Sequence, residues 1–146
     1  MNIWVNGCFD ILHSGHIDLL WYAKLYTNPA MTANTLTINM IFNKLYVGLD
    51  SDERIKQLKG HKRPINDLNT RSTIMQNLRM VDDVFIFDND QELRNLIKYC
   101  KIDYMVVGEQ YRDKEVIGSE NSKYGVIFFP VDQRSTTNII EKIKNS

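Results

Sequence analysis

A run of residues near the amino terminus combines types that suit phosphate chemistry. It reads Gly7-Cys8-Phe9-Asp10-Ile11-Leu12-His13-Ser14-Gly15-His16 and follows a short apolar run. Glycine permits a tight turn at the end of a strand, and a helix that begins there offers free backbone N–H groups to an anion. His13 and His16 are three residues apart, so one helical turn places both imidazoles on the same side, where they can donate hydrogen bonds. The run therefore predicts a phosphate site at a strand-to-helix turn.

Two other interpretations of the histidine pair stay open on residue types alone. Histidines at this spacing can form half of a zinc site, although no cysteine or acidic cluster completes it here. They can also be polar residues at a helix end with no further role. Gly15 allows backbone or ligand to approach closely, and the Asp10 carboxylate can cap the turn.

Two further groups could bind anions. The first is a basic run that comprises Lys59, His61, Lys62 and Arg63, followed by Arg71. Such runs are usually solvated surface, but the fork of Arg63 suits bidentate contact with phosphate. The second is Ser135-Thr136-Thr137, preceded by Arg134. It is a good helix N-cap, and hydroxyls beside free N–H groups also bind phosphate, so both roles can hold together.

Alternating apolar runs and helical patterns must position these groups. Strands are expected at 3–5, 45–49, 84–87, 104–107 and 126–129. Helices are expected at 16–26, with Ile17, Leu20 and Trp21 on one face, and at 51–58, ending near Gly60. A third is capped by Asn66, with Ile74, Met75 and Leu78 on one side, and a fourth by Asp90, with Leu93, Leu96 and Ile97 inward. Ser135 caps a final helix through Ile139, Ile140 and Ile143.

Strands that alternate with helices predict a parallel sheet covered on both faces. We therefore expect a doubly wound, Rossmann-like α/β fold of about five strands, in one domain over residues 1–146. Ligands of such sheets bind beyond the carboxyl ends of the strands, so segments 7–16, 108–111 and 133–137 should converge. Segment 27–43 does not fit this rhythm and is predicted to be an atypical insertion: a long loop, an extra strand or part of a dimer contact.

Composition narrows the class of protein. The 146 residues suit one domain, and the formal net charge of zero argues against a nucleic-acid partner. Cys8 and Cys100 match no metal or disulfide framework, so we expect reduced thiols in a cytoplasmic protein. We see no signal peptide, and no window is apolar enough to span a membrane.

Four segments together resemble the cytidylyltransferase-like nucleotidyltransferases. GCFDILHSGH resembles the family's HxGH signature, and LDSDERIKQLKGHKRPI resembles its strand end, acidic residue and KGxxRP segment. VVGEQY resembles its fourth strand end, and STTNIIEKI its closing helix start. The four occur in the family's order and span nearly the whole chain. Domains that adenylylate heptose 1-phosphate look nearest, and glycerol-3-phosphate cytidylyltransferases somewhat more distant.

The resemblance implies transfer of a nucleotidyl group from ATP or CTP to a sugar or alditol phosphate, with release of pyrophosphate. A sugar 1-phosphate adenylyltransferase is the leading hypothesis. A glycerol-3-phosphate-type cytidylyltransferase and a non-catalytic nucleotide-binding module are the alternatives. The resemblance also implies Mg²⁺ held through the triphosphate and not by protein ligands, and a homodimer.

Site residues carry over by position. Catalytic roles are implied for His13, His16 and Lys59. Nucleotide or phosphate contacts are implied for Gly7, Cys8, Phe9, Asp10, Gly15, Arg63, Gly108, Ser135, Thr136 and Thr137, and acceptor contacts for Asp52, Arg71, Glu109 and Tyr111. Asp10 would orient the loop or contact Mg²⁺ through water, and Arg71 would hold acceptor phosphate or stabilise the loop. Gln110 and Gln133 depart from the family, which often has aspartate and glycine there.

Overall fold

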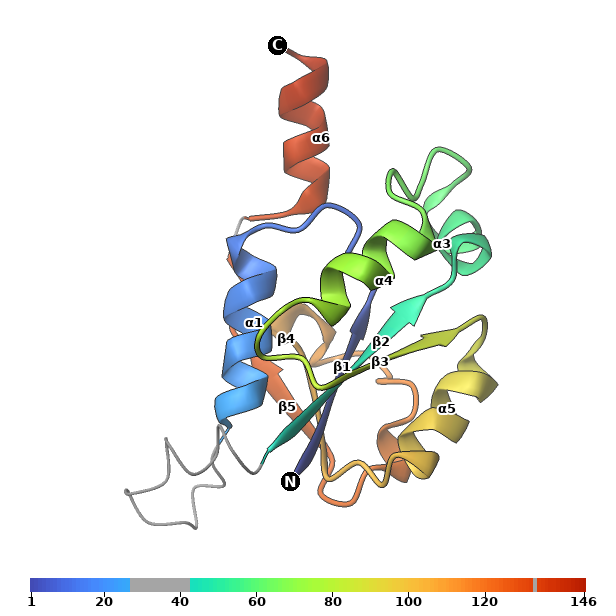
Figure 1. Ribbon diagram of the computed structural model, residues 1–146, viewed down its shortest axis with the longest axis vertical. Helices are drawn as coiled ribbons and strands as arrows, with labels where there is room; N and C mark the ends of the chain where they lie inside the picture. Colours follow the sequence, from blue (N-terminus) through green and yellow to red (C-terminus); the bar gives the residue numbers. More distant parts are fainter. Residues whose placement is uncertain (27–42, 133) are drawn as a thin grey trace.

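One parallel sheet forms the centre of the computed structural model (Figure 1). The structure describes residues 1–26, 43–132 and 134–146. The strands are β1 (Asn2–Gly7), β2 (Lys44–Asp50), β3 (Asp83–Phe87), β4 (Tyr104–Gly108) and β5 (Val126–Phe129). Their spatial order is β3-β2-β1-β4-β5, and every neighbouring pair is parallel. The predicted fold class, a single Rossmann-like α/β domain with five strands, is confirmed.

Helices cover both faces of the sheet. The helix α1 (Ser14–Leu25) packs on β1 and β2, and α4 (Leu68–Gln76) packs on β2 and β3. The helix α5 (Asp90–Tyr99) packs on β3 and on the 3₁₀ turn η2 (Ser119–Asn121) at the other face. The helix α3 (Asp52–Lys59) follows β2, the 3₁₀ turn η1 (Glu109–Tyr111) follows β4, and α6 (Thr136–Lys144) ends the chain.

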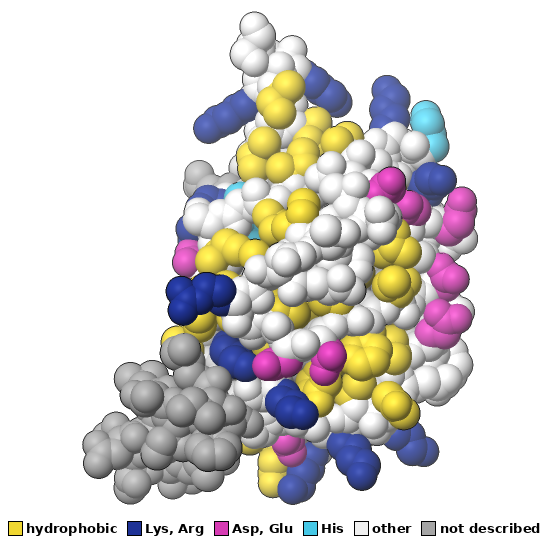
Figure 2. Space-filling view, in the orientation of Figure 1, with side chains coloured by type: hydrophobic (Ala, Val, Ile, Leu, Met, Phe, Trp, Pro, Cys, Tyr) yellow, Lys and Arg dark blue, Asp and Glu magenta, His cyan; other side chains and the backbone are white. Residues whose placement is uncertain are grey.

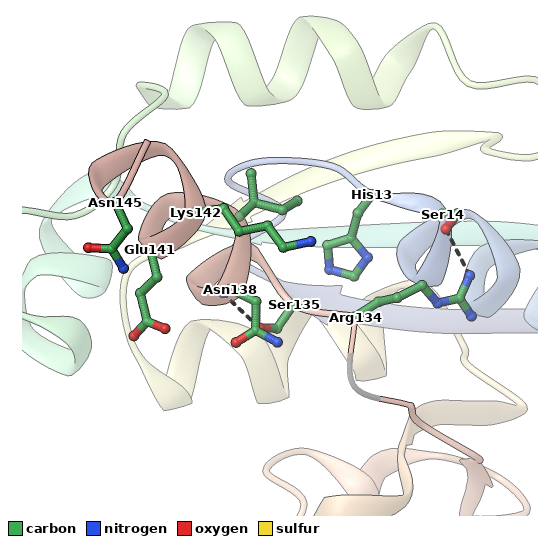
Figure 3. A pocket seen from close by; sticks show the side chains of 9 residues that line it. His13, Ser14, Arg134, Ser135, Asn138, Glu141, Lys142 and Asn145 are labelled. Carbon is green, nitrogen blue, oxygen red and sulfur yellow. Dashed lines mark hydrogen bonds between the residues drawn. The ribbon is translucent and has the colours of Figure 1, made fainter.

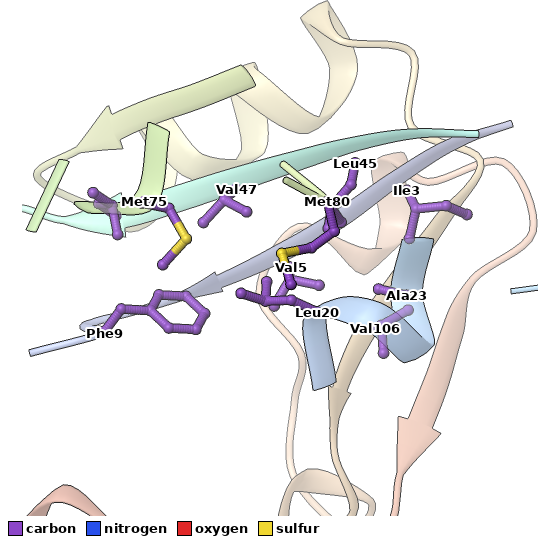
Figure 4. Close-up of a cluster of buried hydrophobic side chains, with 11 residues drawn as sticks. Ile3, Val5, Phe9, Leu20, Ala23, Leu45, Val47, Met75, Met80 and Val106 are labelled. Carbon is purple, nitrogen blue, oxygen red and sulfur yellow. The ribbon is translucent and has the colours of Figure 1, made fainter. Parts of the chain in front are cut away.

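Alternate residues of β1 pack into two separate hydrophobic cores, one on each face of the sheet. Ile3 and Val5 join the cluster under α1 and α4, which Figure 4 shows together with Leu20 and Met75. Trp4 points the opposite way and packs with Phe87, Leu93, Ile97 and Met105 under α5. A strand with both faces buried accounts for the continuous apolar run at its start in the sequence.

Two of the three predicted helix caps are wrong by one residue. Asp67 and not Asn66 caps α4, since its Oδ1 accepts the Thr70 N–H at 2.8 Å. Asn89 and not Asp90 caps α5, because its Oδ1 accepts the Glu92 N–H at 2.9 Å. Tertiary partners draw the two expected residues elsewhere: the Asn66 amide donates to the Asp10 carbonyl at 2.7 Å, and the Asp90 carboxylate binds Arg54 at 2.8 Å.

The helix α6 projects from the body of the fold (Figure 1). Its N-cap prediction is confirmed, because Ser135 Oγ accepts the Asn138 N–H at 3.1 Å. None of its residues is buried, and Ile143 is 66% exposed. Hydrophobic side chains are accordingly visible along α6 in Figure 2.

The chain before the predicted insertion is held to Asn43, the last residue of the insertion, at the amino end of the sheet. Lys24 Nζ donates to the Asn43 carbonyl at 2.7 Å and to Asp82 at 2.6 Å. The Asn43 amide donates to the Tyr26 carbonyl at 2.9 Å. Residues 27–42 lie outside the described residues, so the insertion stays a prediction, as does the dimer. Among the described helices, none has the length and apolarity needed to cross a bilayer.

Adjacent residues of α4 allow a matched test of the packing. Ile74 was expected beside Met75 on one apolar side, but Met75 is 0% exposed and Ile74 is 40% exposed. Met75→Ala leaves a cavity in the core, so we expect it to lower the free energy of unfolding by about 2–5 kcal/mol. Ile74→Ala, the control, should lower it by less than about 1 kcal/mol. Urea unfolding measures both, and equal losses would contradict the described orientation of α4.

Candidate active site

A cleft of about 660 Å³ opens beyond the carboxyl ends of the strands. It lies where β1 separates β2 from β4, which is the point at which the strand order reverses direction. The predicted convergence is confirmed for the described residues, since the cleft is lined by parts of 7–16, 108–111 and 134–137. All but three of the predicted site residues line it: Gly7, Cys8, Phe9, Asp10, His13, Gly15, His16, Lys59, Arg63, Gly108, Tyr111, Ser135, Thr136 and Thr137.

The histidine pair is oriented by the backbone at the start of α1. His13 is the N-cap, and its Nδ1 accepts the Gly15 N–H at 3.1 Å. His16 returns the contact, because its Nδ1 accepts the His13 N–H at 3.3 Å. The two rings stack with centroids 3.9 Å apart, and Phe9 packs edge-on to His16 at 5.2 Å. A neutral imidazole whose Nδ1 accepts carries its proton on Nε2, so each ring presents an N–H donor on its opposite side.

Both imidazoles are held in the neutral form. Burial, the neighbouring His13 and the charge of Lys59 lower the pKa of His16 from 6.5 to about 4. Burial and the nearby Arg134 guanidinium lower the pKa of His13, while Asp132 partly opposes them. At neutral pH the pair therefore acts through N–H donors and carries no net positive charge.

Gly15 leaves room for the His13 ring. A Cβ at this position would lie 3.0 Å from both Cε1 and Nδ1 of His13. The Gly15 N–H is also the donor that fixes His13 Nδ1. Glycine therefore serves the orientation of His13 directly.

Asp10 is engaged by protein groups. Its carboxylate accepts the Arg63 Nε–H at 2.8 Å, the Asn66 N–H at 2.8 Å and the Ile65 N–H at 2.9 Å. Although burial raises the pKa of Asp10, these hydrogen bonds outweigh it and hold the pKa below its ordinary value. Of the two predicted roles, loop orientation fits these contacts. Among the contacts of the described residues, Arg63 uses only Nε to bind Asp10, and it also lines the cleft, so its Nη groups can contact an anion.

Three predicted acceptor residues do not line the cleft. Arg71 is 1% exposed, and its guanidinium donates to the carbonyls of Cys8 and Asp50 at 2.9 Å and to Asp52 Oδ1 at 2.7 Å. These contacts match the second role predicted for Arg71, stabilisation of the loop. Asp52 also accepts the Leu68 N–H at 3.2 Å, and Glu109 pairs with Arg112 at 2.7 Å.

The start of α6 closes one side of the cleft. Thr136 Oγ1 donates to the Ile11 carbonyl at 2.7 Å, which ties α6 to the turn before the histidines. Arg134 donates to Ser14 Oγ at 2.8 Å (Figure 3). It also pairs with Asp18 at 2.8 Å. A second hollow of about 780 Å³ continues past His13 along α6, and in Figure 3 Lys142 extends toward the His13 ring.

Several residues that line the two hollows were not predicted from the sequence. Asp50 and Arg54 form an ion pair on the cleft wall, and Lys142 lines the second hollow. The place of Asp50 at the end of a central strand was an available signal for the first pair. Lys142 gave none, because a lysine on a polar helix is typical of solvated surface. Gln110, one of the departures, also lines the cleft, whereas Gln133 lies outside the described residues.

No group of three or more His, Cys, Asp or Glu side chains among the described residues is arranged to hold a metal ion. The two cysteines are free, and burial with the nearby Asp50 raises the pKa of Cys8. The thiol of Cys8 is therefore protonated at neutral pH and is not a metal-binding thiolate.

The sequence of this chain is similar to those of known proteins over nearly its whole length. The sequence profile described as Cytidylyltransferase-like matches residues 4–142. The bifunctional protein HldE of Campylobacter fetus subsp. fetus (strain 82-40) is 44% identical over 142 residues, covering 97% of this chain and 28% of that protein. HldE of Helicobacter hepaticus (strain ATCC 51449 / 3B1) is 41% identical over 144 residues, covering 99% and 27%. This chain thus spans a little over a quarter of the length of these relatives.

A solved structure has the same fold. The lipopolysaccharide core biosynthesis protein from Thermoplasma volcanium GSS1 superposes with a TM-score of 0.64 at 20% identity, over 92% of this chain and 98% of that one. At this identity the likeness concerns the fold alone.

The histidine geometry predicts an unusual titration. We expect His16 to stay in the Nε2–H tautomer through neutral pH and to titrate near pH 4, because burial, His13 and Lys59 disfavour its charged form. The unfolded chain protonates this ring near pH 6.5, so the contribution of His16 to stability is lost as the pH falls from 6.5 to about 4. Nitrogen-15 NMR of the imidazoles measures tautomer and midpoint. A midpoint at or above 6.5 would contradict the described burial.

Proposed function

This chain belongs to the cytidylyltransferase-like family, and we propose that it transfers a nucleotidyl group from a nucleoside triphosphate to the phosphate of a sugar, releasing pyrophosphate. The observation that carries the proposal is the pair His13 and His16: both residues line the cleft shared with the start of α6, and both Nδ1 atoms accept backbone N–H groups, which leaves each Nε2–H available as a donor. Negative charge grows on the phosphate oxygens in the transition state, and hydrogen-bond donors that are already fixed in a cleft stabilise that charge.

The transfer needs positioning and charge stabilisation but no covalent nucleophile. An oxygen of the acceptor phosphate attacks the α-phosphorus and forms the new P–O bond. The bond from the α-phosphorus to the bridging oxygen breaks, and its electron pair leaves with pyrophosphate. The Nε2–H groups of His13 and His16 donate to the non-bridging oxygens on which negative charge grows. Because both rings start neutral, they keep their protons and serve as donors throughout.

Basic side chains on either side of the pair would hold the remaining phosphates. Lys59 lines the cleft, and it lies near enough to His16 and Cys8 for its charge to lower the pKa of both. We assign Lys59 and the Nη groups of Arg63 to the acceptor and α-phosphates. Ser135, Thr137 and Lys142 at α6 would bind the β- and γ-phosphates, aided by the helix N-terminus.

Magnesium enters as part of the substrate. The Asp10 carboxylate is already occupied by Arg63 and two backbone N–H groups, and the described cleft offers no carboxylate cluster. A Mg²⁺ ion would therefore be held by triphosphate oxygens and water, where it neutralises the leaving pyrophosphate.

Among the possible substrates we infer ATP and a sugar 1-phosphate. The residue pattern resembles heptose 1-phosphate adenylyltransferase domains. An HldE protein is 44% identical to this chain over 97% of this chain's length. A glycerol-3-phosphate-type cytidylyltransferase is the alternative. Pyrophosphate release from ATP and from CTP, each with sugar 1-phosphates and glycerol 3-phosphate, separates the two. No release with any pair would refute the proposal and favour a non-catalytic nucleotide-binding module.

Removal of one donor should abolish most of the rate. His16→Ala deletes an N–H aimed at the developing charge, so we expect kcat to fall roughly 100- to 1000-fold with folding intact. His61→Ala is the matched control, since His61 is exposed and is not part of the cleft lining. A coupled pyrophosphate assay measures both variants. Near-normal turnover of His16→Ala would rule out the assigned role.

Gly15→Ala tests orientation without removing a catalytic group. The added Cβ would lie 3.0 Å from the His13 ring, so the ring must shift. A misplacement on the order of 1 Å can cost about 100-fold in rate, and we expect a kcat loss of roughly 10- to 100-fold with His13 still present. Circular dichroism checks the fold. An unchanged kcat would show that the His13 position is not critical.

A further inference from the structure

A charged pair on the cleft wall takes no part in the transfer chemistry above. Asp50 ends β2, and Arg54 follows within the first turn of α3. Arg54 Nε donates to Asp50 Oδ1 at 2.8 Å, and both residues line the cleft. The Arg54 side chain is 17% exposed and the Asp50 side chain is 10% exposed, so the pair is mostly buried although it borders the open space of the site.

Neighbouring groups hold this pair in one geometry. Arg54 Nη2 donates to Asp90 Oδ1 at 2.8 Å, and its guanidinium lies 5.2 Å from the centre of the Phe87 ring. The Asp50 backbone is fixed as well, because its carbonyl accepts from the buried Arg71 at 2.9 Å. Groups that are fixed beforehand lose little conformational freedom when a ligand binds.

The Asp50 carboxylate retains capacity for a ligand. Its Oδ1 is taken by Arg54, while in the described part of the chain Oδ2 receives only the Cys8 thiol, at 3.7 Å. A thiol is a weak donor, and an ionised carboxylate oxygen can accept two hydrogen bonds. A hydroxyl that reached Oδ2 would therefore gain a charge-assisted hydrogen bond in a largely desolvated wall.

The side of the cleft formed by Asp50 and Arg54 differs in charge from the side assigned to the phosphates. β2 lies on one side of β1, whereas β5, which leads to α6, lies on the other side beyond β4. A carboxylate repels phosphate oxygens, so the Asp50 wall suits an uncharged part of a substrate. Lys59 ends α3, which follows β2, and it lines the same cleft as Asp50 and His16, so an acceptor phosphate bound at Lys59 would lie within the cleft that Asp50 borders. Leu93, Val116 and Ile117 add an apolar surface nearby.

We propose that Asp50, oriented by Arg54, accepts a hydrogen bond from a hydroxyl of the sugar and thereby makes the protein select polyhydroxylated phosphate acceptors. This inference rests on the proposed function, because it assumes that the acceptor phosphate lies near Lys59 and the histidines. It assigns Asp50 as a specificity-determining residue and Arg54 as the residue that positions it.

The first test uses the unaltered protein. Values of kcat/KM are measured with ATP and three kinds of acceptor: heptose 1-phosphate, its monodeoxy analogues, and methyl phosphate, which has no hydroxyl beyond the phosphate. Loss of a hydrogen bond to a charged group predicts a drop of roughly 10-fold or more for at least one monodeoxy analogue. Equal values for all monodeoxy analogues and the parent sugar would overturn the inference.

The second test changes Asp50. Asp50→Asn keeps the size of the side chain and an oxygen for Arg54, but it removes the charge that strengthens the bond to a hydroxyl. We expect the preference for heptose 1-phosphate over methyl phosphate to fall roughly 10-fold, with KM for ATP within about twofold of the wild type. A purely structural role would instead lower kcat/KM for both acceptors by the same factor, and that result would also overturn the inference.

Asp90→Asn is the matched control. Asp90 binds the same guanidinium, but its side chain is 48% exposed and it is not part of the cleft lining. The control should keep the wild-type acceptor preference. If Asp50→Asn does not fold, the monodeoxy series on the unaltered protein decides the question. Wild-type protein that releases no pyrophosphate with any acceptor refutes the proposed function, whereas active protein with an unchanged preference in Asp50→Asn refutes only the present inference.

Discussion

Two hydrogen bonds from the backbone to imidazole nitrogens organise the whole site. The Gly15 and His13 N–H groups point at Nδ1 of His13 and His16, respectively, at the first turn of α1. These N–H groups belong to the part of a helix that lacks internal partners, so the same contacts that cap the helix also choose the tautomer of both rings. The cap and the donor pair are therefore one device. Stabilising the helix start and aiming the two Nε2–H groups are achieved by the same geometry.

The elements around the two histidines mostly hold the turn between β1 and α1 in place. Asp10 fastens the turn to the segment that begins at Arg63, and the buried Arg71 joins the carbonyls at the ends of β1 and β2. The sheet order brings β1 to the centre, so the turn after Gly7 has supported strands on both sides. Rigid support of this kind matters because donors stabilise developing charge only if they are already in position.

Local sequence signals predicted much of this arrangement. The strand runs, the glycines at strand ends and the spacing of His13 and His16 are short-range features, and the structure places them as expected. Partner choice among charged residues was not predictable in the same way. The roles of Arg71 and Arg63 depend on which carbonyls and carboxylates the folded chain brings near them. Contacts of the same long-range kind engage Asn66 and Asp90, and the caps of α4 and α5 each lie one residue earlier than predicted. The Asp50–Arg54 pair was missed because its significance comes from facing the cleft, which spacing along the chain does not reveal.

The exposure of α6 has a thermodynamic consequence for the triphosphate end of the cleft. No residue of α6 is buried, and among the described contacts its start is tied to the turn before α1 by the Thr136 hydroxyl and flanked by the Arg134 ion pairs. An element with so little buried apolar surface opens locally at a small fraction of the global unfolding free energy, and its amides should exchange early with solvent. Binding of a triphosphate must then order this helix, and the conformational entropy that the helix loses reduces the observed binding free energy. Weak anchoring of α6 thereby links substrate affinity to the local folding equilibrium of the last helix.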